Sequence, residues 1–181
     1  MARKTTQPAY RHPRDTRPAP GEAELIAVAK RVTQATGAPV IGGVAVILHG
    51  GGRTTADVDI LSEDLWTTHI QLEDAGILWD SKRREHVTDG IPVRLVPIEM
   101  VGSAEEGLRK ASTIKGVKVV SLADLVRIKL ASGLANAARA KDLAHVVDLV
   151  QRVPLDKSFA SKLPQHLRAP FKKLVDTIRQ D

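Results

Sequence analysis

The spacing of apolar residues predicts helices in the first half of the chain. Five apolar residues recur with helical spacing near the N-terminal end: Leu25, Ile26, Ala29, Val32 and Ala35. Gly37 is expected to end this helix, and a short helix is predicted over 44–49. An amphipathic helix is predicted over 63–75, with Ser62 as its N-cap residue.

Shorter apolar runs between these helices predict strands. Residues 58–61 read as one strand and residues 117–120 as another. The stretch REHVTDGIPVRLVPIEM holds two alternating runs around Asp89-Gly90, a dipeptide that is typical of a two-residue hairpin turn. In that register Thr88 pairs with Ile91 and His86 pairs with Val93 on the two predicted strands.

The last third of the chain reads as helical. Ser121 to Asp124 fits a capping box that begins a helix through Ala131, and further helices are predicted over 137–150 and 164–178. The order of elements is helix, strand, short helix, strand, helix, hairpin, strand, then two or three helices. This order predicts an α/β (α+β) protein: a small mixed β-sheet with flanking helices and a C-terminal helical section.

Charge is distributed unevenly over the 181 residues. Residues 1–20 and 152–181 each have a net charge of +4, whereas residues 21–151 have a net charge of −2. Because the first segment also holds four prolines, we expect a disordered basic arm over 1–20, an α/β domain over 21–120 and a helical section over 121–181. Basic ends can attract nucleic acid, although a merely solubilising arm has the same composition.

Composition excludes several classes of function. The chain has no cysteine, which rules out disulfides, thiolate metal sites and cysteine nucleophiles. It has no apolar run long enough for a membrane span and no apolar secretory segment, so we expect a cytoplasmic protein with no membrane partner.

The stretch HGGGRTTADVDILS carries the most distinctive chemistry. On a strand, Asp57 and Asp59 would present two carboxylates on one face, roughly 6.6 Å apart, while Val58 faces the core. Paired carboxylates suit Mg²⁺ or Mn²⁺ in phosphoryl chemistry. The glycines before them can bring backbone amides close to an anion, and Arg53 with Thr54 and Thr55 adds donors for phosphate oxygens. Alternatively, DVD only caps a strand at the surface and the glycines form an ordinary loop.

Two longer stretches resemble a known family. IGGVAVILHGGGRTTADVDIL resembles the nucleotidyltransferase superfamily motif: a glycine pair, a helix, HG, an R-T turn, then D-h-D-h, where h is an apolar residue. VSLADLVRIKLASGLANAARAKDLAHVVDLV resembles the helical module of small prokaryotic members, including AbiEii-type toxins. The resemblance covers roughly residues 38–150 and implies a nucleotidyltransferase-like fold.

The resemblance also implies roles for particular residues. Asp57 and Asp59 would be catalytic and hold Mg²⁺ or Mn²⁺, and Lys129 would approach the phosphate or the substrate. Asp142 would fix the helical module, in which Leu125, Arg139 and Lys141 are further motif positions. The nucleotide, a nucleoside triphosphate (NTP), would be bound by a larger set that includes the phosphate-lining glycines: Gly42, Gly43, Gly50, Gly51, Arg53, Thr54 and Arg94.

Arg94 departs from the family pattern, which places a third carboxylate at this position of the next central strand. A guanidinium cannot ligate a metal ion. Arg94 therefore marks a non-catalytic relative, grips phosphate in place of one metal, or is structural. The hairpin register would pair it with Glu85, which lies on the same face as the missing carboxylate and could substitute for it. Glu99 is a poorer substitute, because its side chain would point the other way.

The sequence thus favours transfer of a nucleoside monophosphate from an NTP to an acceptor hydroxyl. RNA, including tRNA, is the favoured acceptor because of the basic ends, and a protein side chain is the second. The alternative is a degenerate transferase that binds nucleotide, RNA or a protein partner without turnover. A toxin neutralised by an antitoxin protein is a third hypothesis.

The remaining aromatic and histidine residues suggest no further chemistry. The histidines show no spacing typical of a metal site, and His49 is expected to bond the glycine turn. Trp66 and Trp79 are expected to pack in the core or at its edge.

Overall fold

The structure is a computed structural model that describes residues 19–52, 54–101 and 107–180. Its α-helices are α1 (Glu22–Thr36), α2 (Gly42–Leu48), α3 (Leu65–Asp74), α4 (Leu122–Ala135), α5 (Ala140–Arg152) and α6 (Gln165–Gln180). Its strands are β1 (Val40–Ile41), β2 (Val58–Ser62), β3 (Leu78–Asp80), β4 (Glu85–Thr88), β5 (Ile91–Pro97), β6 (Ser112–Ile114) and β7 (Val117–Val119). Short 3-10 helices are η1 (Ile98–Met100), η2 (Ala137–Arg139) and η3 (Lys157–Lys162).

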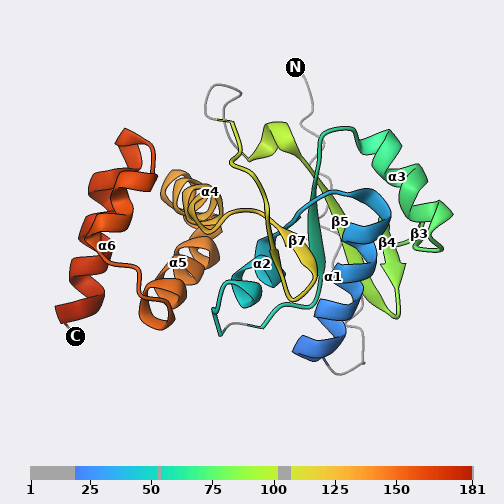
Figure 1. The fold of residues 1–181 in the computed structure, drawn as a ribbon, viewed down its shortest axis with the longest axis horizontal. Helices are drawn as coiled ribbons and strands as arrows, with labels where there is room; N and C mark the ends of the chain where they lie inside the picture. The colour runs from blue at the N-terminus through green and yellow to red at the C-terminus, as the bar shows by residue number, and fades with distance from the viewer. Residues whose placement is uncertain (1–18, 53, 102–106, 181) are drawn as a thin grey trace, which may run out of the picture.

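The seven strands form one mixed sheet in the order β3-β4-β5-β2-β1-β7-β6 (Figure 1). Strand β2 runs parallel to β5 and antiparallel to β1, and β1 in turn runs parallel to β7. The sheet with its flanking helices confirms the α+β class that the order of elements predicted. Because β2 lies at the centre of the sheet, the residues it carries are held from both sides.

The core is aliphatic, and it fixes the orientation of β2. Val58 and Ile60 are fully buried, and they pack with residues of α1, β1 and β5 in a single apolar cluster. Since side chains alternate along a strand, burying these two residues turns Asp57 and Asp59 towards the opposite face. Core packing therefore decides where the carboxylates point.

The predicted helices are present, with two corrections. The first predicted helix is α1, which ends at Gly37 in the left-handed conformation that glycine favours. The N-cap residue of α3 is Asp64 and not Ser62, because the Asp64 carboxylate accepts hydrogen bonds from the amides of residues 66 and 67. Ser62 is instead buried and hydrogen-bonded to Thr68 at 2.8 Å. The helix predicted over 137–150 is divided into η2 and α5.

The predicted hairpin is β4–β5, and its register is the one expected from Asp89-Gly90. Thr88 pairs with Ile91 and His86 with Val93. The edge strands β3 and β6 were not predicted, and each has only three residues. Such short segments carry too few positions for an alternating pattern to stand out.

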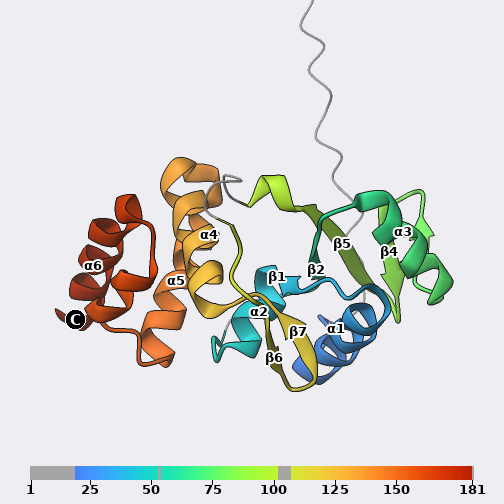
Figure 2. The same cartoon turned by 45° about the horizontal axis from the view of Figure 1, so that its top comes forward.

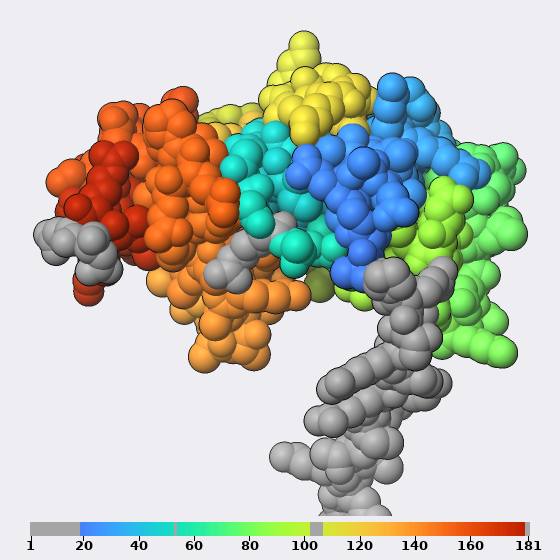
Figure 3. Space-filling view, turned by 90° about the horizontal axis from the view of Figure 1, so that it is seen from below, coloured from blue at the N-terminus to red at the C-terminus, as the bar shows by residue number. Residues whose placement is uncertain are grey.

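The helices α4, α5 and α6 gather at one end of the molecule, and α3 with β3 and β4 lies at the other end (Figures 1 and 2). In the space-filling view, α2 and the turn after it lie between the C-terminal helices and α1 (Figure 3). Among the described residues, no helix has the length and apolar character that crossing a bilayer requires. The expected disordered arm, residues 1–20, lies almost entirely outside the described residues.

Candidate active site

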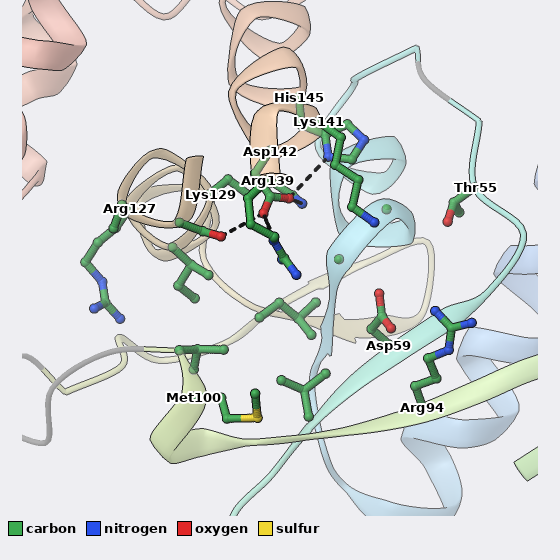
Figure 4. Close-up of a pocket in the computed structure, with 18 of the residues that line it drawn as sticks. Thr55, Asp59, Arg94, Met100, Arg127, Lys129, Arg139, Lys141, Asp142 and His145 are labelled. Carbon is green, nitrogen blue, oxygen red and sulfur yellow. Dashed lines mark hydrogen bonds and ion pairs between the residues drawn. The ribbon is translucent and has the colours of Figure 1, made fainter. Parts of the chain in front are cut away.

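A cleft of about 1400 Å³ separates the sheet from the helical section. Its sheet side includes Asp57 and Asp59, and its helical side includes Lys129, Arg139 and Lys141. Figure 4 shows Asp59 and Arg94 facing these basic side chains across the cleft. The cleft therefore combines acidic groups on one wall with cations on the other.

The glycine pair that begins α2 makes room for the site. Gly42 has a φ of +74°, and a Cβ at this position would collide with the Asp59 carboxylate. A Cβ at Gly43 would lie 2.5 Å from the Cβ of Thr55. Both glycines line the cleft, as does Thr54. Their observed role is to let the backbone of α2 approach the strand that carries the carboxylates.

Asp59 is a poorly compensated carboxylate. Burial raises its pKa to about 6, and repulsion from Asp57 adds to the shift. The cations Arg94, Lys129 and Lys141 oppose this shift without cancelling it. Such a carboxylate favours an added cation or a proton, and raised pKa values of this kind are typical of functional sites.

Arg94 lies beside Asp59 on the adjacent strand, in direct register between β2 and β5. Its Nη1 donates to Asp57 Oδ2 at 2.5 Å, and its Nε donates to Glu85 Oε2 at 3.1 Å. Asp57 also accepts a hydrogen bond from Thr55 Oγ1 at 2.7 Å. The predicted pairing of Glu85 with Arg94 is present, and Arg94 also neutralises one carboxylate of the DVD pair.

Asp142 joins the helical wall of the cleft. Lys129 Nζ lies 3.2 Å from Asp142 Oδ1, while Arg139 Nε and Ser132 Oγ donate to Oδ2 at 2.8 and 2.9 Å. Burial raises the pKa of Asp142, but Lys129, Ser132 and Arg139 together hold it below its usual value. Burial also lowers the pKa of Lys129, against the attraction of Asp142. Asp142 thus pairs with Lys129 of α4 and Arg139 of η2.

The second glycine turn differs from the expectation. Gly50 and Gly51 do not line the cleft; their amides donate to the carbonyls of Ile47 and Val46, which closes the end of α2. Gly52 lines the cleft in their place. The prediction that Gly50 and Gly51 line the phosphates therefore has no support in the geometry. Arg53 lies outside the described residues.

Asp148 holds this turn against α5, and His49 holds α2 against the end of β7. The Gly52 amide donates to Asp148 Oδ2 at 2.8 Å, and Arg152 binds the other oxygen of Asp148. His49 Nε2 lies 2.8 Å from the Val120 carbonyl oxygen, so it ties α2 to the end of β7 rather than to the glycine turn. Asp148 was not predicted, although an acidic residue inside the apolar run 146–150 was a usable signal.

Comparison with known proteins agrees with this architecture. The sequence matches no protein-family model and no curated protein sequence. The structure is similar to a crystal structure described as a "putative nucleotidyltransferase from H. pylori", with a TM-score of 0.51 and 17% identity over 88% of this chain and 80% of that one. JHP933 from Helicobacter pylori is equally similar, at a TM-score of 0.51 and 17% identity over 86% of this chain and 76% of that one. The chain therefore has a nucleotidyltransferase-like fold.

The role of Gly42 in the cleft can be separated from backbone strain by comparison with Gly37, which does not line the cleft. If the cleft binds a nucleotide, Gly42→Ala should lower that binding because its Cβ displaces the Asp59 carboxylate, whereas Gly37→Ala should not. Gly37 has a similar φ of +66° but nothing within 4 Å of a Cβ. Both variants should lose about 1–2 kcal/mol of stability from the left-handed backbone. Thermal melts and nucleotide titrations of the two proteins check this, and equal binding by both would contradict it.

Proposed function

We propose that this protein transfers a nucleoside monophosphate from an NTP to an acceptor hydroxyl, with release of pyrophosphate. The observation that carries the proposal is one cleft in which Asp57 and Asp59 face Arg139 and Lys141. A triphosphate needs cations around its oxygens, and a reacting phosphate needs an acidic pair that can hold a divalent metal ion. The cleft volume of about 1400 Å³ leaves room for a nucleotide and part of an acceptor.

The acidic wall fits Mg²⁺ or Mn²⁺. Asp57 and Asp59 supply only oxygen donors, and the raised pKa of Asp59 reflects burial beside another carboxylate without full compensation. When bound, the metal ion would neutralise charge on the phosphate oxygens and orient the reacting groups. The residues of the chain itself would fix the metal on one wall and the triphosphate on the other.

The basic wall supports triphosphate binding. Lys141 and Arg139 are exposed towards the cleft, and Asp142 holds Arg139 and Lys129 in fixed positions. We assign Lys141 to the phosphates and Lys129 to the electrostatics of the site, because Lys129 is buried on Asp142. The glycine pair would allow the nucleotide to approach the backbone closely.

Arg94 would act by contact with phosphate and by orienting Asp57. Glu85 holds its Nε, so the rest of the guanidinium is directed to the cleft beside Asp57. A held arginine can bind phosphate oxygens and supply positive charge where the family pattern has a third carboxylate.

The acceptor we propose is RNA, with tRNA included, and a protein hydroxyl is the second choice. Residues 152–181 have a net charge of +4, and the surface of α6 exposes Lys172 and Lys173. Such a surface attracts the phosphate backbone. The AbiEii-like resemblance suggests a cytoplasmic toxin whose basic helices an acidic antitoxin protein would cover.

One observation favours a second candidate function. The Arg94–Asp57 ion pair already neutralises one of the two metal ligands. A module that binds nucleotide, RNA or a protein without turnover would keep this pair and need no metal ion.

The function can be tested by label transfer. Purified protein is incubated with each α-labelled NTP, Mg²⁺ or Mn²⁺, and either total RNA or a protein extract. The proposal expects metal-dependent label on an acceptor, with RNA labelled more than protein. No label on either acceptor under any of these conditions would contradict it and favour the binding module.

The pH dependence of transfer follows from Asp59. Metal binding needs the ionised carboxylate, so kcat/KM should rise with pH through about 6 and level off above it. Arg94 lowers the pKa of Asp59, so Arg94→Gln should move the rise to higher pH. A pH profile of both proteins at low metal concentration checks this, and a rise that moves to lower pH in the variant would contradict it.

A further inference from the structure

Three potential metal ligands meet at the end of the molecule away from the cleft, where Figure 1 shows α3 beside β3 and β4. His69 and Glu73 lie one turn apart on α3, and His86 is a fully buried residue of β4. His69 Nδ1 lies 2.9 Å from His86 Nε2, and Glu73 Oε1 lies 3.8 Å from the same nitrogen. The three ligand atoms all lie within 4.8 Å of one another.

These separations suit a small tetrahedral ion. With metal–nitrogen bonds of 2.0–2.1 Å, the ligand atoms around zinc lie roughly 3.3 Å apart. The observed 2.9 and 3.8 Å lie on either side of this value, so only small side-chain movements are needed. Two imidazoles with one carboxylate favour Zn²⁺ over Mg²⁺ or Ca²⁺, which prefer oxygen ligands alone.

A hydrogen bond between the two imidazoles explains only their close approach. Glu73 Oε1 accepts a hydrogen bond from the Trp79 amide at 2.6 Å and lies 3.8 Å from His86 Nε2. A carboxylate oxygen has two lone pairs, so this hydrogen bond leaves Glu73 able to bind a metal ion as well.

We propose that His69, Glu73 and His86 form a zinc-binding site that joins α3 to the β3–β4 edge of the sheet. Three protein ligands leave one coordination position for water. The site is separate from the cleft and does not depend on the proposed function. Bound zinc would stabilise the folded chain by tying a surface helix to an edge hairpin.

The surroundings of the site supply a specific reporter. Trp66 and Trp79 were expected in the core or at its edge. Trp66 does not pack in the core, since it is 72% exposed, and Trp79 lies on the edge strand β3. The rings of Trp66 and His69 are 5.6 Å apart, and those of Trp79 and His86 are 5.1 Å apart. Because the chain has only these two tryptophans and both lie beside the site, their fluorescence is a local reporter of metal binding there.

The test uses the full chain with Asp59→Asn, in excess Mg²⁺, so that metal in the cleft is not counted. Zn²⁺ is titrated by calorimetry, and paramagnetic Co²⁺ is followed by quenching of tryptophan fluorescence. We expect one Zn²⁺ per chain. His69→Gln and Glu73→Gln, both on the helix surface, should each weaken binding by more than about tenfold.

His166→Gln is the matched control, since His166 is an exposed histidine on α6, and it should bind Zn²⁺ unchanged. Circular dichroism verifies that each variant is folded. His86 is not substituted, because a change at this fully buried residue can unfold the protein. Absence of bound Zn²⁺ in the Asp59→Asn protein would overturn the proposal, as would equal affinity in His69→Gln. Neither result bears on nucleotidyl transfer, which is measured separately in the wild-type protein.

Discussion

Asp59→Asn is expected to lower the rate of nucleotidyl transfer by more than about a hundredfold. This loss is larger than the one usually caused by removing a residue that only hydrogen-bonds to a metal ligand. The substitution keeps the size of the side chain but removes the charge that would bind the divalent ion. Because the Asp59 pKa is about 6, the wild-type group is mostly ionised at pH 8, where the comparison should be made. The measurement is the initial rate of label transfer at saturating NTP.

Glu63→Gln is the control for this substitution. Glu63 is an exposed carboxylate that follows β2 directly and does not line the cleft. The Glu63→Gln protein should transfer label at the wild-type rate. If Asp59→Asn retained more than about a tenth of the wild-type rate, Asp59 would not be a metal ligand of the reaction.

Asp142→Ala is expected to reduce the free energy of unfolding by about 3–5 kcal/mol. Asp142 and Lys129 are both almost fully buried, with side-chain exposures of 3% and 7%. Removing the carboxylate leaves the Lys129 ammonium buried without its partner, and it also removes the acceptor of Arg139 and Ser132. Urea unfolding followed by far-UV circular dichroism measures the change.

Asp176→Ala is the matched control for this loss. Asp176 pairs with Lys157 at 2.9 Å, but both side chains are about half exposed. Removing an exposed pair should cost less than about 1 kcal/mol. Lys129→Met combined with Asp142→Leu should recover much of the stability lost by Asp142→Ala, because it buries no unpaired charge. Similar losses in Asp142→Ala and Asp176→Ala would contradict the buried-pair interpretation.

The sequence predicted those parts of the fold that depend on local patterns. The spacing of apolar residues located α1, and Asp89-Gly90 fixed the register of the β4–β5 hairpin. That register correctly brought Glu85 to Arg94. The N-cap of α3 was misassigned because Ser62 and Asp64 are both good capping residues, and core packing uses Ser62 to bond Thr68.

The site was harder to predict from the sequence, because its geometry depends on contacts between segments that are distant along the chain. Alternation along a strand predicted that Asp57 and Asp59 share a face. It could not predict that Asp148 of α5 would bind the Gly52 amide and so hold the glycine turn. Likewise, His69 and His86 are 17 residues apart, and only the packing of α3 on the sheet edge brings their rings together.

Arg94 decides between the two accounts of the cleft. Its contacts with Asp57 and Glu85 resemble a structural ion-pair network, and they also orient a guanidinium beside Asp59. In the transferase account, the metal ion would bind Asp57, and Arg94 would contact phosphate while it orients Asp57. In the binding-module account, their ion pair persists and nucleotide binds without metal.

We propose that Asp57 and Asp59 hold a divalent ion together with the triphosphate in this cleft. Calorimetric titration of an NTP analogue with an α,β-methylene linkage, with and without Mn²⁺, into wild-type and Asp59→Asn protein measures this binding. The wild-type protein should bind the analogue only in the presence of Mn²⁺, and Asp59→Asn should not bind it. Equal affinity without Mn²⁺, or in Asp59→Asn, would contradict this proposal.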